Sequence, residues 1–375
     1  MNDKKILMVA ATPFFYDRGF HIRVYSEMKY LMKSGYDVTL CTYGFGNTPE
    51  GFNVKRCLNF PWYKKITPGP SWHKVYVDVA LFFTVLKQVI LTKPAIIHAH
   101  LYESLIISVF IKILSFNKAK VVFDCQGGLV EELYRYSFSK YSFTKIFIPV
   151  FSLLERMLLK FPDLILCSSE NSKRILTKNY KISPERISLL SDEVDLDIFK
   201  NTSAKTNISV PQGNAVIIYA GSLEKAKGID VLLDAIPEIL QSRKDMTFIF
   251  AGYGSLVSEY ENELKSFVES GNVIFMGHVS YFDIPAILKG AHYGIETKQN
   301  TTESSAKLDL YMAAGLKVLC FKNDFYYSKL GNDGVYLNSV MDLKDLQKIG
   351  KTAYSLKTWE ENIGILISKY KELAI

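Results

Sequence analysis

Cysteine is scarce in this chain of 375 residues. The five cysteines are scattered beside apolar runs and have no metal-ligand spacing; they are Cys41, Cys57, Cys125, Cys167 and Cys320. Their odd number, and the lack of a signal-peptide pattern, predict reduced thiols in the cytoplasm rather than disulfides. We expect them to be small buried hydrophobic residues.

Long apolar runs without a charge are also missing. The stretch 105–116 is interrupted by Lys112, and the stretch 146–161 carries Glu155, Arg156 and Lys160. A helix that spans a bilayer needs about 20 consecutive, mostly apolar residues. The sequence therefore predicts no transmembrane helix, and we interpret both stretches as buried helices of an α/β domain.

Acidic residues are few in the first half of the chain. Residues 1–180 hold 24 Lys and Arg against 13 Asp and Glu, whereas the remainder holds 21 against 25. This asymmetry indicates that the first half faces an anionic partner. A membrane surface, a lipid diphosphate and a nucleic acid all fit that description.

Short apolar runs recur along the chain, separated by segments of helical length. The expected strands are 5–11, 37–42, 95–100, 120–124 and 164–167, and then 215–220, 247–251, 273–276, 293–296 and 317–321. A helical period covers 23–33, and an amphipathic helix is expected over 359–373. The polar stretch 201–207 separates the two series of strands. Such alternation predicts two α/β domains, each a doubly wound parallel sheet of the Rossmann type.

The most informative stretch is Ser304-Ser-Ala-Lys-Leu-Asp-Leu-Tyr-Met-Ala-Ala-Gly315. Two serines and Lys307 open a helical run that ends at Gly315 and leads into an apolar strand. A helix start with hydroxyls, free N–H groups and a cation suits an anion. The block resembles the nucleotide-sugar site of the family-4 glycosyltransferases, which have the GT-B fold.

The resemblance implies two facing Rossmann-like domains with a cleft between them. It places an acceptor-side domain at 1–200 and a nucleotide-sugar-binding domain at 208–350. Residues 351–375 are expected to form a C-terminal helix that crosses back to the first domain.

The donor diphosphate is expected at two loops of the second domain. Tyr219–Gly228 resembles the family's strand–loop–helix opening, in which an arginine and a lysine bind the diphosphate. Lys227 matches the lysine, and Ser222 stands where the arginine is usual. Taken alone, the segment would be a glycine-ended turn with surface lysines. Beside the 304–315 block it indicates phosphate binding, for which the expected residues are Gly221, Ser222, Lys227, Ser304, Ser305 and Lys307.

The ribose end of this site departs from the family. Two glutamates are usual there, and their positions fall on Leu310 and Thr302, with Glu303 and Asp309 one place away. One residue on a helix is a rotation of about 100°. Either local shifts bring Asp309 or Glu303 to the ribose, or other groups hold the sugar ring.

Further donor contacts follow from the resemblance alone. His100 is expected to bind the donor sugar, and Glu296 to contact the transferred sugar. Gly252, Gly277 and Val279 are expected around the nucleoside. His98 and His100 flank Ala99, but no third metal ligand is spaced near them, so no metal site is predicted.

Two glycine-containing loops after strands are expected near the substrates: Gly19 is expected to bind the donor, and Arg18, Gly127 and Gly128 are expected on the acceptor side. Arg18 and Gly19 follow the first strand, where the family has a loop close to the donor phosphate and acceptor. Gly127 and Gly128 follow the strand 120–124. Ligands usually bind at this end of parallel strands, although a plain connecting loop would show the same pattern.

Two segments, 60–76 and 134–147, combine aromatic residues with lysine and arginine. This mixture suits a membrane interface or single-stranded nucleic acid. It also suits ordinary packed helices with solvated lysines. Nucleic acid is disfavoured because no reading motif accompanies the segments.

The resemblance implies a retaining hexosyltransferase that uses a nucleotide-diphosphate sugar, a glycan or lipid-linked acceptor and neither metal nor cofactor. Lys227 and Lys307 would stabilise the leaving diphosphate. The segment Asp195-Leu-Asp197 has the form of a metal motif but resembles a family linker. We expect a role in surface polysaccharide or glycoconjugate synthesis at the inner face of the membrane. Two alternatives stay open: a degenerate scaffold subunit, favoured by Leu310 and Ser222, and a sugar-nucleotide epimerase using Glu296 and Glu303.

Overall fold

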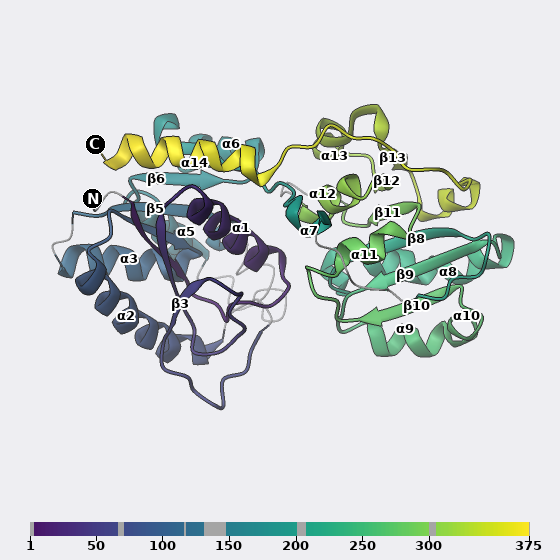
Figure 1. Cartoon of the computed structure of the whole chain (residues 1–375), viewed down its shortest axis with the longest axis horizontal. Coiled ribbons are helices and arrows are strands. Elements are labelled where there is room, and N and C mark those ends of the chain that lie inside the picture. The colour runs from purple at the N-terminus through teal and green to yellow at the C-terminus, as the bar shows by residue number, and fades with distance from the viewer. Residues whose placement is uncertain are drawn as a thin grey trace. The chain divides into compact units, whose positions relative to one another are not determined.

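A computed structural model describes residues 4–66, 71–115, 118–130, 148–200, 208–299 and 305–374 (Figure 1). Glu303, Ser304 and the segment 134–147 lie outside the described residues. The chain divides into two compact units. Unit 1 contains Met1–Asp192 and Trp359–Ile375, and unit 2 contains Glu193–Thr358.

Unit 1 is built on a seven-stranded parallel sheet in the order β3-β2-β1-β4-β5-β6-β7. The strands are β1 (Lys5–Ala10), β2 (Asp37–Thr42), β3 (Asn53–Arg56), β4 (Ile96–His100), β5 (Lys120–Cys125), β6 (Leu164–Cys167) and β7 (Ile187–Leu189). The helices are α1 (Gly19–Lys33), α2 (Trp72–Thr92), α3 (Tyr102–Leu114), α5 (Ile148–Leu158), α6 (Glu170–Lys178), the short η3 (Pro184–Arg186) and α14 (Trp359–Ala374). The central strands are continuous apolar runs because helices cover both faces of the sheet.

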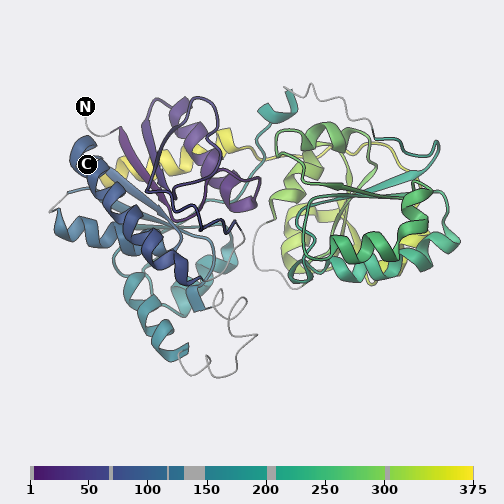
Figure 2. The same cartoon turned by 90° about the horizontal axis from the view of Figure 1, so that it is seen from below.

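The two faces of this sheet carry different helices (Figure 2). Successive strand residues point to opposite faces. Leu7, Val9 and Ile97 pack with α2 and α3, and the same face continues to α5. His98 and His100 alternate with these residues and face α1 and α14, which pack against each other.

The last helix, α14, completes unit 1 from the far end of the chain. The Tyr370 hydroxyl lies 2.7 Å from Nδ1 of His98, and Asn362 donates to the Ser191 carbonyl at 2.6 Å. Trp359 at its start is fully buried beside the Arg23 guanidinium.

Unit 2 has a six-stranded parallel sheet in the order β10-β9-β8-β11-β12-β13. The strands are β8 (Ala215–Ala220), β9 (Met246–Ala251), β10 (Val273–Gly277), β11 (Tyr293–Glu296), β12 (Lys317–Phe321) and β13 (Val335–Leu337). The helices are α7 (Asp197–Lys200), η4 (Lys225–Lys227), α8 (Ile229–Ser242), α9 (Val257–Glu263), α10 (Lys265–Glu269), α11 (Ile284–Lys289), α12 (Ala306–Ala313), α13 (Asp324–Leu330), η5 (Gly331–Asp333) and η6 (Val340–Asp345). The two Rossmann-like sheets confirm the predicted fold class.

One helix of unit 1 has the length and composition of a bilayer span. Helix α2 is long and apolar enough to cross a bilayer by length and composition, with a mean hydropathy of 1.7 over its best window. It is not free of charges, because Lys74, Asp78 and Lys87 lie within it. A stripe of Val77, Leu81 and Val85 nevertheless packs α2 into the core of unit 1.

Candidate active site

The start of α12 gathers a cation, a carboxylate and a hydroxyl in unit 2. Lys307 Nζ lies 3.3 Å from Oε1 of Glu296, the last residue of β11, and 4.1 Å from the centre of the Tyr219 ring. Ser305, which precedes α12, donates its hydroxyl to Glu296 at 2.6 Å instead of capping the helix. Three predicted site residues are thus brought together.

The Lys307–Glu296 pair is ionised although it is largely buried. Burial opposes the charge of Glu296, but the attraction of Lys307 and the Ser305 hydrogen bond lower the pKa of this carboxyl. Burial also opposes the charge of Lys307, yet Glu296 and the neighbouring tyrosine oxygens raise the pKa of the ammonium group. The site therefore holds a permanent cation at a helix start.

Glycines allow the loops around Lys307 to approach closely. A Cβ on Gly221 would lie 3.4 Å from Lys307 Nζ, so the backbone after β8 lies directly beside this cation. A Cβ on Gly252 would lie 1.8 Å from the Gly221 carbonyl oxygen. The loops after β8 and β9 therefore pack backbone against backbone.

Lys227 belongs to the same group of loops. Its carbonyl accepts a hydrogen bond from the Thr297 hydroxyl at 2.9 Å, one residue beyond Glu296. Gly228 follows with φ +67°, and a Cβ there would meet the Thr297 carbonyl oxygen at 2.9 Å. The backbone of the Lys227 loop is thereby fixed next to the end of β11.

At the expected ribose end of the site, the described part of α12 offers no unpaired carboxylate. Leu310 is buried. Asp309 is also buried, and its carboxylate pairs with Lys329 of α13 at 2.7 Å. Asp309 is therefore paired with α13 and does not replace the ribose-binding glutamate in this structure.

The remaining predicted donor residues lie at strand ends of unit 2. The Ser222 carbonyl accepts from the Tyr219 hydroxyl at 3.0 Å. Gly277 ends β10 with φ +66°, and a Cβ there would meet nothing within 4 Å; Val279 follows half-buried. These positions share one edge of the sheet with Gly221 and Gly252, as parallel strands require.

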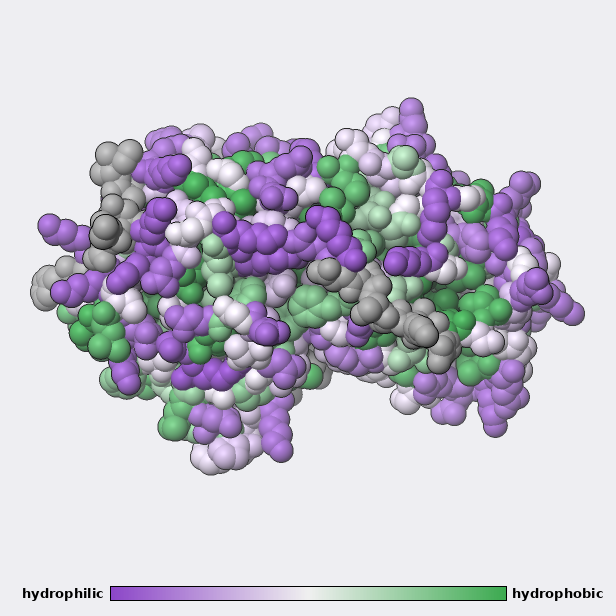
Figure 3. Space-filling model, in the orientation of Figure 1, coloured by the Kyte–Doolittle hydropathy of each residue, from purple (hydrophilic) through white to green (hydrophobic). Residues whose placement is uncertain are grey.

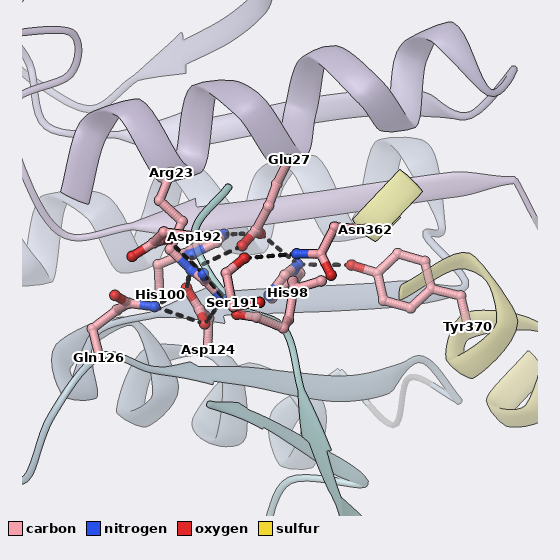
Figure 4. Close-up of polar contacts among 11 residues, drawn as sticks. Arg23, Glu27, His98, His100, Asp124, Gln126, Ser191, Asp192, Asn362 and Tyr370 are labelled. Carbon is pink, nitrogen blue, oxygen red and sulfur yellow. Dashed lines mark hydrogen bonds and ion pairs between the residues drawn. The ribbon is translucent and has the colours of Figure 1, made fainter. Parts of the chain in front are cut away.

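In unit 1, His100 lies in a buried polar network below α1 (Figure 4). Its Nδ1 is 3.2 Å from Asp124, and its Nε2 has no hydrogen-bond partner among the described residues. Burial lowers the pKa of His100, although Asp124 opposes this effect. The imidazole is therefore neutral and fully buried.

Arg23 organises this network. Its guanidinium donates two hydrogen bonds of 2.8 Å to Asp124 and one of 2.8 Å to Asp192. Burial opposes ionisation of Asp124, but Arg23 overcomes it and lowers the pKa of the carboxyl. From the sequence, Asp124 was expected only as part of a strand, with no link to Arg23.

The structure corrects the expectation that His98 and His100 have no third metal ligand. Glu27 of α1 joins them, and donor atoms of the three residues lie within 4.8 Å of one another. By geometry this group could hold a metal ion. However, Nε of Arg23 lies 3.1 Å from the Glu27 carboxylate, so an ion would face a fixed positive charge.

A protonated Glu27 explains the burial of Glu27, His98 and His100 more simply than a bound metal ion does. Burial, aided by the charge of Asp124, raises the pKa of Glu27. Nε2 of both histidines lacks a hydrogen-bond partner within the described structure, and Glu27 Oε2 lies 3.7 Å from Nε2 of His100. A neutral carboxyl lets Glu27 stay buried beside the two histidines without a metal ion, and no hydrogen bond joins the three side chains.

The loop with Arg18 and Gly19 and the loop with Gly127 and Gly128 are each anchored within unit 1. Arg18 donates to the Ile66 carbonyl, and Gly19 begins α1 at an exposed position with open space around it. The loop after Gly127 and Gly128 is fixed by Glu155, whose carboxylate accepts from the Leu129 N–H at 2.7 Å. Glu155 is fully buried, although in the sequence it stands out only as an interruption of an apolar run.

The five cysteines are free and buried, as expected. Burial raises the pKa of Cys41, Cys125, Cys167 and Cys320 to about 12, and that of Cys57 to about 11. These thiols stay protonated and take no part in the site.

Comparison with known families agrees with this arrangement. Residues 18–198 match Glycosyltransferase Family 4, and residues 214–346 match Glycosyl transferases group 1. The chain belongs to the family-4 glycosyltransferases.

A curated relative is a phosphatidylinositol N-acetylglucosaminyltransferase component from Arabidopsis thaliana. It is 21% identical over 293 residues, which are 77% of this chain but only 61% of the relative. The chain thus spans less than two thirds of that protein.

Two solved structures share the fold. Anabaena Alr3699/HepE in complex with UDP-glucose has a TM-score of 0.65 and 15% identity, covering 99% of this chain and 97% of its own. Sucrose-phosphate synthase of Thermosynechococcus elongatus has a TM-score of 0.69 and 14% identity, covering 99% and 94%. Both have the GT-B fold, which confirms the predicted fold class.

Proposed function

We propose that this glycosyltransferase moves a sugar from a nucleotide-diphosphate sugar to a glycan or lipid-linked acceptor, with retention at the anomeric carbon. The proposed setting is surface polysaccharide or glycoconjugate synthesis at the cytoplasmic face of a membrane. The observation that carries the proposal is the buried Lys307–Glu296 pair at the start of α12, beside the backbone of Gly221.

This group suits a leaving diphosphate. Negative charge develops on the diphosphate as the glycosidic bond breaks, and a fixed cation stabilises that charge without reorganisation. Lys307 is held in place by Glu296, and the N-terminus of α12 adds a favourable dipole. Lys227 supplies a second cation from a loop whose backbone is tied to the end of β11.

The proposed mechanism uses neither a metal nor a covalent enzyme intermediate. The acceptor hydroxyl arrives on the face that the diphosphate leaves, and a phosphate oxygen takes its proton. The role that the resemblance gives to His100, a hydrogen bond to the donor sugar, requires its buried Nε2 to become accessible when the donor binds. EDTA treatment should therefore leave sugar transfer unchanged.

Two relatives support the choice of substrates. The name of the Arabidopsis protein specifies N-acetylglucosamine and phosphatidylinositol, and the Anabaena protein was crystallised with UDP-glucose. We therefore infer a UDP-sugar as donor and a lipid-linked molecule as acceptor.

One observation favours a second candidate function, a non-catalytic GT-B subunit. Leu310 replaces the usual ribose-binding glutamate, and Asp309 is held by Lys329. An epimerase on the same fold has less support, because Glu296 is engaged by Lys307 and Ser305.

The test begins with thermal shifts of the full chain in the presence of UDP-glucose and UDP-N-acetylglucosamine, followed by donor hydrolysis. Lys227→Ala and Lys307→Met should each lower turnover on the order of a hundredfold, because each removes a cation from the leaving group. Lys289→Ala, at an exposed lysine of α11, is the matched control and should keep full turnover.

Three results decide between the functions. Loss of turnover in the two variants with unchanged circular dichroism supports transfer. Turnover that both variants retain contradicts the assigned roles of the lysines. Wild-type protein that binds no sugar nucleotide at millimolar concentration favours the non-catalytic subunit.

A further inference from the structure

Helix α2 is apolar on two opposite sides. Val77, Leu81, Val85 and Val89 recur at every fourth residue and are buried in the core. Residues two places away lie about 200° around the helix, and Val75, Val79 and Phe83 are exposed there. A helix on the surface of a soluble domain usually carries polar residues on that side.

The neighbouring helices continue this surface. Exposed apolar residues cover the outer side of α3 and α5, including Phe110, Leu114, Leu153 and Met157. Helix α3 packs beside α2, and the Lys112–Asp163 pair of 2.9 Å joins α3 to the segment after α5. We call the exposed apolar residues of α2, α3 and α5 the apolar face. Hydrophobic side chains emerge among polar ones where α2 and α3 lie (Figure 3).

The opposite side of the same sheet is different. Among the described residues of α1 and α14, only Ile365 is an exposed large hydrophobic residue. Isolated surface hydrophobic residues need no explanation, but a contiguous patch over several helices marks an interaction site.

We propose that the apolar face of unit 1 lies on an anionic lipid bilayer, with α2 in the plane of the interface. The helix meets the length and hydropathy of a bilayer span, but its buried stripe holds it against β1 and β2. It therefore rests on the membrane and does not cross it. Trp72, the first residue of α2, is 92% exposed. Tryptophan side chains are enriched at the membrane–water interface, where this proposal places Trp72.

Charge supports a lipid surface rather than a second protein chain. Lys87 lies within the outer stripe of α2, Lys93 follows its end, and Lys160 follows α5, all exposed. Acidic groups beside the face are already paired: Asp163 binds Lys112 and Lys120, and Glu103 binds Lys74. An apolar centre with surplus cations matches acyl chains beneath anionic headgroups.

This surface differs from the membrane contact predicted from the sequence. That prediction named 60–76 and 134–147, and only the start of α2 is common to both. The inference deepens the proposed function, since it would bring unit 1 to a lipid-linked acceptor, but vesicle binding can be measured without sugar transfer.

The experiment is co-sedimentation of the full chain with vesicles of equal parts phosphatidylglycerol and phosphatidylcholine, and with pure phosphatidylcholine. The test variant is Phe83→Glu with Leu153→Glu, which changes two separate helices of the apolar face. The control is Val231→Glu with Val268→Glu, two exposed valines of unit 2 with the same charge change. Circular dichroism and thermal shift with UDP-glucose monitor folding and donor binding of each protein.

The wild-type chain and the control should bind the anionic vesicles, and binding should persist at 0.5 M salt because apolar burial contributes. The test variant should lose on the order of tenfold or more in partitioning. Equal binding of test and control variants overturns the proposal. Failure of the wild-type chain to bind vesicles also overturns it. In that case, a dimer that ultracentrifugation detects for the wild-type chain and the control but not for the test variant would assign the apolar face to a second copy of the chain. Donor binding without vesicle binding leaves the proposed reaction intact.

Discussion

The Lys307–Glu296 pair combines a stabilising role with the proposed catalytic one. Glu296→Gln leaves a buried ammonium group without its carboxylate, and we expect unit 2 to lose about 3 kcal/mol of unfolding free energy. The matched control is Glu238→Gln, which breaks an exposed pair with Lys344 and should cost less than about 1 kcal/mol.

The loss of unfolding free energy in Glu296→Gln can be assigned to unit 2. All three tryptophans, Trp62, Trp72 and Trp359, belong to unit 1. Urea unfolding followed by circular dichroism should therefore show the Glu296→Gln shift, whereas tryptophan fluorescence should not. Equal losses of unfolding free energy in Glu296→Gln and Glu238→Gln would mean that the buried pair stabilises the protein no more than an exposed pair does.

His21 makes unit 1 sensitive to mild acid. Burial, with the nearby Arg18 charge, lowers the pKa of His21 to about 3 from 6.5. Its stabilising contribution is present above pH 6.5 and is lost as the pH falls from 6.5 towards 3, because only the unfolded chain takes up the proton. The loss is about 1.4 kcal/mol per pH unit.

Unfolding free energies from tryptophan fluorescence at pH 7.5 and 5.5 test this. His21→Gln should reduce the slope of unfolding free energy against pH by about 1.4 kcal/mol per pH unit, which corresponds to one proton. A pH dependence that His21→Gln does not alter would show that His21 is protonated in the folded state.

At the scale of elements, the packing of α12 on β11 depends on one missing side chain. A Cβ on Gly294 would lie 2.3 Å from the Tyr311 ring, whose hydroxyl accepts from the Ala220 N–H. Gly294→Ala should destabilise unit 2 by about 2 kcal/mol through this overlap.

The control for this change is Gly290→Ala, where the nearest atom would lie at 3.8 Å. It sits just before β11, so both variants test the same region. Thermal unfolding followed by circular dichroism should separate them, and similar melting temperatures would show that the Tyr311 ring can move aside.

The buried strands were predictable because each is a short apolar run. The expected 37–42, 164–167, 215–220 and 293–296 coincide with β2, β6, β8 and β11. The edge strands β3, β7 and β13 were not predicted. Each has only three or four residues, and three of the four residues of β3 are polar, so it lacks the apolar run that marks the central strands.

The site was predictable where its residues are close in sequence, and less so elsewhere. The 304–315 block and Glu296 are near one another along the chain, and their contact follows from one loop. Glu27 and His98 meet only through the order of the strands, and Asp309 turns to Lys329 because of α13. Contacts between residues so far apart in the chain cannot be predicted from a local sequence pattern.

At the scale of the whole molecule, α14 decides whether unit 1 is complete. A chain ending at residue 358 would leave Nδ1 of His98 and the carbonyl of Ser191 without their partners on α14, and would expose the pocket of Trp359. We expect the fluorescence of the remaining tryptophans to show a broad, weakly cooperative unfolding of unit 1.

Residues 193–358 alone should instead keep a cooperative transition, because unit 2 is a continuous stretch of chain. Circular dichroism melts of the two fragments and of the full chain test both statements. A sharp, unshifted transition of unit 1 in the fragment 1–358 would contradict the role given to α14.

The return of α14 also sets an order of events during synthesis. Tyr370 and His98 are 272 residues apart in the chain. All of unit 2 is translated before the last helix of unit 1, and domains generally fold as units during synthesis. The half that is synthesised first is thus completed last, and until then the part of its sheet that α14 covers stays exposed.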